Sequence, residues 1–181
     1  SGPGATNLVT GIATAQMDSV PLVVVTGQVP RPAIGTDAFQ ETDIFGITLP
    51  IVKHSWVIRN PTDIARVVSQ AFFVAASGRP GPVLIDIPKD VGQEFFNYKK
   101  VLPCETIPKG FKRLGEINED DVNKAVELIK NSQKPLLYVG GGAIASGAHK
   151  QLQTLSRDCQ IPVTTTLMGK GIFDERDDLS V

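Results

Sequence analysis

The sequence has few of the residues that mark several specialised protein classes. Of its 181 residues only two are cysteines, Cys104 and Cys159, and they form no C-x-x-C pair. Free thiols in a reducing compartment are therefore expected, not a disulfide framework. Lysine plus arginine (18) nearly balances aspartate plus glutamate (19), which argues against both a nucleic-acid-binding face and an acidic tail. No apolar run reaches membrane-spanning length, and the N-terminus does not resemble a signal peptide.

The sequence does have enough apolar material for a packed core, since 41% of its residues are hydrophobic. Its two ends look unlike the ends of a complete protein. It begins with Ser-Gly-Pro-Gly and no methionine, and it stops soon after a strand-like segment. We therefore expect an incomplete part of a longer chain.

The most informative stretch is TGQVPRPAIGTDAFQETDIF, residues 26–45. It follows the apolar run of residues 21–25. A buried strand that opens into a long polar loop is typical of the ligand-binding edge of α/β proteins. The stretch contains no histidine, no cysteine and no paired carboxylates at ligand spacing. The residues alone therefore leave a functional loop and an ordinary surface loop equally open.

Helices and strands are predicted to alternate in the first half of the chain. A tight glycine-rich turn is expected at residues 1–4, and a short helix capped by Thr42 within residues 41–47. The unbroken apolar runs predict strands buried on both faces of a parallel sheet. The remaining predicted elements are a helix at 5–17, a helix from Asn60 to Gly78, and strands at 21–26, 51–58 and 82–87.

The second half predicts a separate unit. Residues 98–117 mix Lys, Pro and Gly without a period and are expected to form a linker. A helix at 118–131 follows, and then a right-handed βαβ unit with strands at 135–139 and 161–166 and a helix at 145–159. The predicted fold class is thus α/β with parallel sheets.

Several single residues invite a functional reading. One strand is followed by three glycines, Gly140, Gly141 and Gly142. Such a turn can bind a dinucleotide, or it can serve close packing alone. The sequence leaves both open, because the G-x-G-x-x-G pattern and the downstream acidic residue of dinucleotide sites are not present. Arg79 lies in a rigid Gly-Arg-Pro-Gly turn suited to a phosphate or partner contact. Asp86, inside an apolar strand, requires a hydrogen-bond partner.

Five segments together resemble a known family. They are SGPGATN at residues 1–7, TGQVPRPAIGTDAFQE at 26–41, KH at 53–54, SGRPGPVLIDIPKD at 77–90 and KPLLYVGGGAI at 134–144. The chain resembles, over essentially its whole length, the large catalytic subunits of the acetohydroxyacid synthase (acetolactate synthase) family of thiamin-diphosphate-dependent enzymes.

The resemblance implies a domain plan and a reaction. Residues 1–97 are expected to be the C-terminal half of the pyrimidine-binding domain, and residues 118–181 the N-terminal half of a Rossmann-like middle domain that binds FAD. The implied reaction is decarboxylation of pyruvate and transfer of the two-carbon unit to a second 2-ketoacid, pyruvate or 2-ketobutyrate. That reaction begins the synthesis of valine, leucine and isoleucine.

The resemblance also implies roles for single residues. Gln40 is expected to be catalytic, close to thiamin diphosphate and the reacting atoms. The residues expected to contact FAD are Arg79, Gly140, Gly141, Gly142, Thr166 and Leu167. The residues expected to line the substrate channel, where inhibitors bind, are Ser19, Pro30, Ala38, Phe39, Lys53 and Lys89.

The family pattern is incomplete in this chain. The glutamate that activates thiamin, and the GDG…N motif that holds Mg²⁺ and the diphosphate, are not present, so no metal ligand is assigned here. We expect this chain alone to be inactive and to bind neither cofactor well. The implied partners are a second large subunit and a small regulatory subunit, with no nucleic acid and no membrane, in a bacterial cytoplasm or plastid stroma. A different thiamin-diphosphate carboligase, such as glyoxylate carboligase, and a nonenzymatic nucleotide-binding module remain alternatives.

Overall fold

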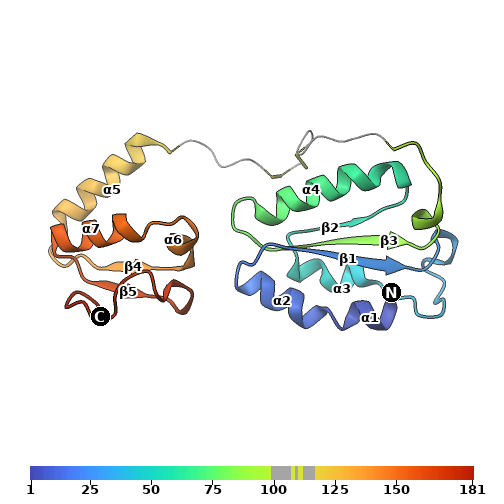
Figure 1. The fold of residues 1–181 in the computed structure, drawn as a ribbon, viewed down its shortest axis with the longest axis horizontal. Helices are drawn as coiled ribbons and strands as arrows, with labels where there is room; N and C mark the ends of the chain where they lie inside the picture. The colour runs from blue at the N-terminus through green and yellow to red at the C-terminus, as the bar shows by residue number, and fades with distance from the viewer. Residues whose placement is uncertain (99–106, 109, 112–116) are drawn as a thin grey trace. The chain divides into compact units, whose positions relative to one another are not determined.

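The computed structural model describes residues 1–98, 107–108, 110–111 and 117–181. The chain forms two compact units, Ser1–Gly115 and Glu116–Val181 (Figure 1). Cys104 and most of the predicted linker at 98–117 lie outside the described residues. The domain assignments of the two halves stay predictions.

The first unit has three layers. Its sheet is wholly parallel, with the strand order β1-β3-β2. Helix α4 covers one face, and α1, α2 and α3 cover the other (Figure 1). The strands are β1 (Leu22–Gln28), β2 (His54–Val57) and β3 (Pro82–Pro88), and the helices are α1 (Gly2–Thr6), α2 (Val9–Met17), α3 (Ile44–Thr48) and α4 (Ile64–Ala76).

Strand β3 is the centre of this unit. Val83 and Ile85 pack toward α4, while Leu84 packs on the opposite face toward α1, α2 and α3. All three are fully buried, as the apolar run predicted. Strand β1 differs from the prediction, because its side chains alternate between buried and exposed and Val25 is 59% exposed. In the described sheet β1 lies at an edge, where the α4 cluster covers Val23 but leaves Val25 exposed.

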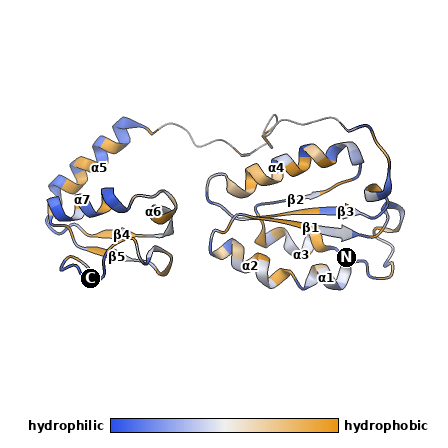
Figure 2. Ribbon diagram, in the orientation of Figure 1, coloured by the Kyte–Doolittle hydropathy of each residue, from blue (hydrophilic) through white to orange (hydrophobic). Residues whose placement is uncertain are grey.

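Strands β1 and β3 both become polar toward their carboxyl ends. Apolar residues at the start of β1 give way to Thr26, Gly27 and Gln28, and those of β3 give way to Asp86. Figure 2 shows the corresponding change along β1, from orange at its start to a pale carboxyl end. Because the strands are parallel, these polar residues gather at one edge of the sheet.

The N-terminal segment corrects the sequence prediction. Residues 2–4 are helical instead of forming a tight turn, because Pro3 fits the first turn of α1. The expected single helix at 5–17 is interrupted at Asn7 and Leu8, so that α1 and α2 are separate. Helix α3 is capped by Asp43, whose side chain accepts a hydrogen bond from the Gly46 N–H, and not by Thr42 as predicted.

Asparagine side chains cap the segments that begin two longer helices, and a glycine follows the end of one of them. The Asn60 side chain accepts from the Thr62 N–H in the short 3-10 turn Pro61–Asp63 that leads into α4. Gly78 adopts a φ of 57° just beyond the end of α4, as a glycine at a helix terminus does. In the second unit the Asn118 side chain accepts from the Asp120 N–H at the start of α5.

The second unit is a βαβ arrangement with a parallel pair, β4 and β5. Its core contains Val139, Val163, Ile172 and Phe173. The elements are α5 (Glu119–Asn131), β4 (Leu137–Val139), α6 (Gly141–Ala145), α7 (His149–Cys159) and β5 (Val163–Thr165). The predicted glycine turn is wrong in detail, because Gly141 and Gly142 already belong to α6 and a break at residues 146–148 separates α6 from α7. No helix in the described part of the chain is long and apolar enough to cross a bilayer.

Candidate active site

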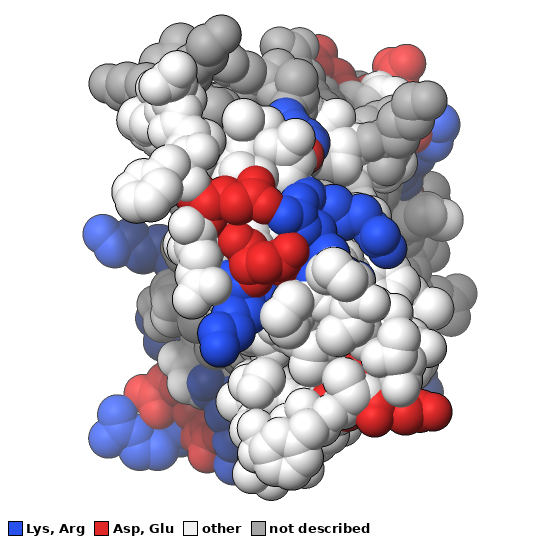
Figure 3. Space-filling view, turned by 90° about the vertical axis from the view of Figure 1, so that its right-hand side faces the viewer, with Lys and Arg blue, Asp and Glu red and all other residues white. Residues whose placement is uncertain are grey.

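A cavity of about 560 Å³ opens at the carboxyl edge of the first unit's sheet. This is a size typical of small-molecule sites. Its lining combines apolar side chains with carboxylates and one guanidinium. The lining residues are Gln28, Ile34, Gly35, Glu41, Asp43, Phe45, Val57, Arg59 and Asp86. Figure 3 faces this edge, where acidic and basic side chains meet within a largely uncharged surface.

The floor of the cavity is a buried polar network around Asp86. The Thr26 hydroxyl donates to Oδ1 of Asp86 at 2.7 Å, and the Gln28 amide donates to Oδ2 at 3.2 Å. Thr26 and Asp86 are directly paired in the β1–β3 ladder, so one sheet face supplies both groups. The predicted hydrogen-bond partners of Asp86 are thus confirmed. Burial raises the pKa of Asp86, and the bonds from Thr26 and Gln28 oppose that rise.

Gln28 extends this network to the long loop. Its amide nitrogen also donates to the Thr42 carbonyl at 2.9 Å, and its amide oxygen accepts from the Val29 N–H at 2.9 Å. Gln28, which is 8% exposed, therefore connects the end of β1 to Thr42, near the end of the loop. The network fixes the loop against a rigid sheet, as a binding site requires.

Glu41 organises the loop at residues 35–41. Its Oε2 accepts from the Ala38 N–H at 3.0 Å, and its Oε1 accepts from the Gly35 N–H. These backbone hydrogen bonds lower the pKa of Glu41, with the bond from Gly35 the largest cause. The carboxylate is therefore anionic and held by the backbone of its own loop.

The loop presents Gln40 at the tip of a tight turn. The Glu41 N–H donates to the Ala38 carbonyl at 2.8 Å, and Gln40 adopts a left-handed φ of 60°. Gly2 lies directly against this turn, because a Cβ built on Gly2 would fall within 2.9 Å of the Gln40 carbonyl carbon. The glycine-rich N-terminal segment and the Gln40 loop, far apart in sequence, are thus in contact.

Arg31 links the ends of all three strands. Its backbone N–H and its Nε donate to Asp90 at 3.0 and 2.7 Å, and its Nη1 donates to the Arg59 carbonyl at 2.8 Å. Nη2 forms an ion pair with Glu94. The hydrogen bond to Asp90 is the main cause of the raised pKa of Arg31, and the same bond lowers the pKa of Asp90. Residues that follow β1, β2 and β3 are therefore joined by one side chain.

The predicted site residues of the first unit divide between two edges of the sheet. Gln40, Pro30, Ala38, Phe39 and Lys89 lie beyond the carboxyl ends of the strands. Phe39 is 90% exposed, and the Lys89 N–H donates to the Gln28 carbonyl at 3.0 Å. Three others, Ser19, Lys53 and Arg79, lie just before the strands, at the amino edge.

The amino-edge residues contact one another or helix ends. Arg79 donates to the Ser19 hydroxyl at 2.8 Å and to the Met17 carbonyl at the end of α2 at 3.0 Å. Lys53 donates to the Ser77 carbonyl at 2.6 Å and to the Val74 carbonyl, both at the end of α4. Burial lowers the pKa of Lys53. Both cations therefore cap helix C-termini, where the dipole favours positive charge.

The His54 ring packs among aromatic side chains. Its ring meets the Trp56 ring edge-on, with centroids 4.4 Å apart, and lies 5.9 Å from the Phe111 ring. Burial lowers the pKa of His54, so the neutral form is favoured among these rings. Within the described residues, no group of three or more His, Cys, Asp and Glu side chains is arranged to hold a metal ion.

The predicted residues of the second unit do lie together, at the carboxyl ends of β4 and β5. Gly140 precedes α6, and a Cβ built on it would lie 3.7 Å from the Thr166 hydroxyl, an ordinary contact. Gly141 is packed tightly against Met168, whereas Gly142 has open space around it. Packing within the unit thus explains Gly141 but not the other two glycines. Leu167, 82% exposed, lies beside them in the turn after β5.

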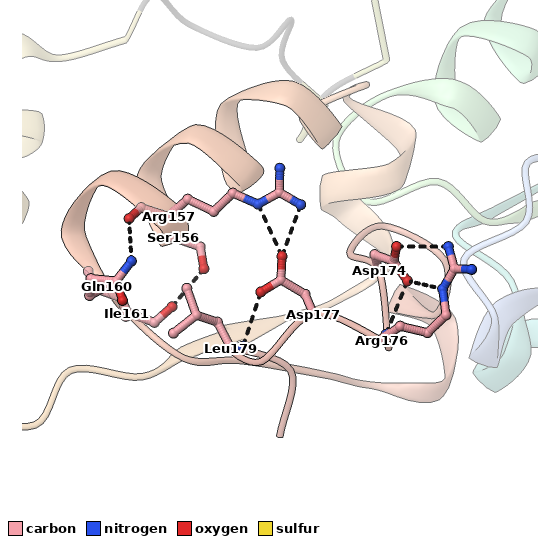
Figure 4. A network of polar contacts seen from close by, with 8 residues as sticks. All are labelled: Ser156, Arg157, Gln160, Ile161, Asp174, Arg176, Asp177 and Leu179. Carbon is pink, nitrogen blue, oxygen red and sulfur yellow. Dashed lines mark hydrogen bonds and ion pairs between the residues drawn. The ribbon is translucent and has the colours of Figure 1, made fainter.

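A separate polar network holds the end of the second unit (Figure 4). Arg157 on α7 donates to Oδ2 of Asp177 at 3.0 and 2.9 Å, and Oδ1 of Asp177 accepts from the Leu179 N–H at 3.1 Å. Nearby, the paired guanidinium of Arg176 lowers the pKa of Asp174 to about 2. These bonds join α7 to the segment after β5, so their role is structural.

The sequence reasoning missed three residues of the carboxyl edge. Glu41, Arg31 and Gly2 had no assigned role, although each lies within a segment that carried the family resemblance. The available signal for Glu41 was its position, since it directly follows the predicted catalytic residue Gln40. Nothing local in the sequence indicates that Arg31 reaches two other strand ends.

Two protein-family models match the chain. The model described as "Thiamine pyrophosphate enzyme, N-terminal TPP binding domain" matches residues 1–47, which include the Gln40 loop. The model described as "Thiamine pyrophosphate enzyme, central domain" matches residues 122–181. The two matches fall in different compact units.

Among known proteins, the chain is similar to large subunits of one enzyme. It is 71% identical over all of its 181 residues to the acetolactate synthase large subunit of Parasynechococcus marenigrum, covering 29% of that protein. It is 60% identical to the acetolactate synthase of Arthrospira platensis, again over the whole chain and 31% of that protein. The large subunit of Porphyra purpurea is 60% identical over 97% of the chain and 30% of that protein. The chain thus spans about three tenths of the length of these relatives.

Proposed function

Because this chain belongs to the acetolactate synthase large-subunit family of thiamine pyrophosphate enzymes, we propose that the protein carrying it decarboxylates pyruvate and transfers the two-carbon unit to a second 2-ketoacid. The observation that carries the proposal is the 71% identity along the whole chain. The matched region spans the cavity edge, the Gln40 turn and the glycines after β4. The product would be acetolactate from pyruvate, or acetohydroxybutyrate from 2-ketobutyrate.

Gln40 is the residue of this chain that we place beside the thiamin group. When bound, that cofactor supplies the electron sink for decarboxylation. The carboxyl edge fits such a group, because a cavity of about 560 Å³ with both apolar and polar lining lies next to the turn. The amide of Gln40, exposed at the tip of the turn, can orient a ligand by donating or accepting a hydrogen bond.

The second unit fits the flavin proposed for this family. Packing within the unit does not require glycine at positions 140 and 142. Because these residues have no side chain, a ligand could approach their backbone closely. The Thr166 hydroxyl accepts from the Gly169 N–H at 3.2 Å, and its own hydrogen remains to donate. We propose that Gly140, Gly141, Gly142, Thr166 and Leu167 contact FAD, together with Arg79. Mg²⁺ we assign to residues outside this chain.

The channel and partner assignments follow from the same family. We propose that Ser19, Pro30, Ala38, Phe39, Lys53 and Lys89 line the route by which 2-ketoacids reach the site. A pair of large subunits and a small regulatory subunit complete the proposed assembly, in a bacterial cytoplasm or a plastid stroma. Ser19 and Lys53 would line this route, and Arg79 would contact FAD, while keeping the hydrogen bonds that they make at the amino edge.

A chimeric enzyme tests this proposal directly. The 181-residue segment would replace its counterpart in the Parasynechococcus marenigrum large subunit, to which it is 71% identical. We expect acetolactate formation from pyruvate that depends on added thiamin diphosphate, and 2-ketobutyrate accepted as a second substrate. A folded chimera that forms no acetolactate would contradict the proposal.

The role of Gln40 has its own test in the same chimera. Gln40→Ala should lower acetolactate formation by about tenfold or more, because an orienting hydrogen bond is lost from the reacting groups. It should leave the thermal unfolding midpoint nearly unchanged, since the Gln40 side chain is exposed. Activity equal to that of the unsubstituted chimera would remove Gln40 from the site.

A further inference from the structure

The turn that presents Gln40 is held by the residue that follows it. The backbone of Glu41 closes the turn by donating to the Ala38 carbonyl at 2.8 Å. Its side chain returns to the same residue and accepts from the Ala38 N–H at 3.0 Å. Glu41 therefore bonds to both the carbonyl and the N–H of Ala38, and Gln40 lies between these two residues in the chain.

The loop contains several left-handed residues, and its backbone N–H groups converge on one carboxylate. Gly35, Asp37 and Gln40 have left-handed φ values of 83°, 57° and 60° within six residues. Alternation of left- and right-handed residues turns successive N–H groups inward, toward a common point. The Glu41 carboxylate occupies that point, because its two oxygens accept from Gly35 and Ala38.

The conformation is one that the residues themselves disfavour. A left-handed φ is uncommon for a residue other than glycine, asparagine or aspartate, so Gln40 in particular needs support from its surroundings. Gly2 restrains the Gln40 carbonyl from one side by close packing. On the other side, the described contacts that hold the turn come from Glu41.

Direct contact between Glu41 and a ligand is disfavoured by the same geometry. Glu41 lines the cavity, but each of its carboxylate oxygens already accepts a backbone hydrogen bond. A carboxylate that left this position to act as an acid or base would leave two N–H groups unpaired. The structure therefore favours action through the turn.

We propose that Glu41 is a positioning residue for Gln40, whose carboxylate fixes the loop at residues 35–41 so that the Gln40 amide faces the reacting groups. The catalytic part of this inference rests on the proposed function. The structural part concerns the loop alone and is separately testable.

The structural part is tested by amide hydrogen exchange in the 181-residue chain. Glu41→Gln keeps the size of the side chain but removes its charge and replaces one oxygen by an NH₂ group. We expect exchange at the Gly35 and Ala38 amides to become about tenfold faster, because charge-assisted hydrogen bonds are lost. Asp37→Asn is the matched control, since within the described residues the Asp37 carboxylate makes no hydrogen bond and asparagine tolerates its φ of 57°. Unchanged exchange at both amides in Glu41→Gln would overturn the inference.

The catalytic part is tested by a double-mutant cycle in the chimera. Glu41→Gln alone should lower kcat about tenfold while changing KM less than threefold, because it alters orientation and not substrate binding. Adding it to Gln40→Ala should cause almost no further loss in kcat, since the catalytic group that Glu41 positions is already gone. Losses that multiply, or a change in KM alone, would show that Glu41 does not act through Gln40.

The two arms separate the possible failures. An inactive unsubstituted chimera would overturn the proposed function and with it the catalytic part, while the exchange measurement still decides the structural part. An active chimera with additive losses would overturn the positioning role alone.

Discussion

The two edges of the first unit's sheet use charge in different ways. At the carboxyl edge, carboxylates and Arg31 connect strand ends to one another around a cavity. At the amino edge, Lys53 and Arg79 each donate to the carbonyls that end a helix. The first arrangement holds loops in place around the cavity, and the second satisfies the carbonyls at helix ends. Charged residues of similar appearance in the sequence therefore differ in function according to the edge where they lie.

The strongest test of this contrast is Gly2→Ala at the carboxyl edge. The new Cβ would press on the Gln40 carbonyl, and Gly2 has a φ of 26° that alanine disfavours. We expect unfolding of the 181-residue chain in urea to show a loss of about 3 kcal/mol. Gly4→Ala is the control, because nothing lies within 4 Å of its Cβ position and alanine favours a helix. Equal effects of the two substitutions would show that Gly2 does not pack on the turn as described.

The second test removes the buried carboxylate. Asp86→Ala leaves the Thr26 hydroxyl without its acceptor at a buried site, and Gln28 loses one of two acceptors. We expect a loss of about 2 kcal/mol in the free energy of unfolding. Asp43→Ala, which removes an exposed helix cap at the same cavity, should be less damaging. A larger effect at Asp43 would contradict the central place of Asp86.

A smaller effect is expected for lysines at opposite edges. Lys53→Met keeps most of the apolar side chain but loses the bonds to the Val74 and Ser77 carbonyls, so stability should fall by about 1 kcal/mol. Lys89→Met, at the carboxyl edge, should leave chemical denaturation nearly unchanged, because the Lys89 side chain is exposed. If both substitutions destabilised the chain equally, the distinction between the edges would be lost.

The smallest expected effect is a change in how stability depends on pH. Glu41 has a folded pKa below its ordinary value of 4.5, so its contribution is present above that value and is lost as pH falls through the folded pKa. Asp86 has a folded pKa above 3.8, so its contribution has the opposite sign and is lost as pH rises through that folded pKa. Glu41→Gln should therefore flatten the acid side of the stability profile, and Asp86→Asn should flatten the decline above about pH 4. Denaturant titrations across this pH range would measure the free energy of unfolding of each variant. If both variants kept the pH dependence of the unsubstituted chain, the described environments of Glu41 and Asp86 would be wrong.

The sequence predicted the sheet better than it predicted the surroundings of the sheet. The apolar run at 82–87 correctly indicated the buried strand β3, because its neighbours on both sides are β-strands. A similar run predicted the same for β1, and the exposed Val25 shows that apolar character alone does not reveal which face a neighbour covers. The glycines and proline of residues 2–4 suggested a turn, yet packing against the Gln40 loop is compatible with a helix there.

The candidate site was predictable in position but not in its internal support. The polar stretch after the first strand, and Gln40 within it, pointed to the carboxyl edge where the cavity lies. The Glu41 contacts depend on left-handed conformations at Asp37 and Gln40. Aspartate tolerates that conformation, but glutamine has no preference for it that would have indicated the turn. The contacts of Ser19 with Arg79 join residues 60 positions apart, so they exist only after β1 and β3 have paired.

The bond between Thr26 and Asp86 also has a consequence for folding. These residues face each other in the β1–β3 ladder, where Val24 and Leu84 form the preceding pair on the same face. A shift of β1 by one residue would place Val25 or Gly27 opposite Asp86 and leave a buried carboxylate without its hydroxyl donor. Wrong alignments of the two strands would therefore carry a penalty that an all-valine ladder does not impose. The Thr26–Asp86 bond therefore favours the native register of β1 against β3.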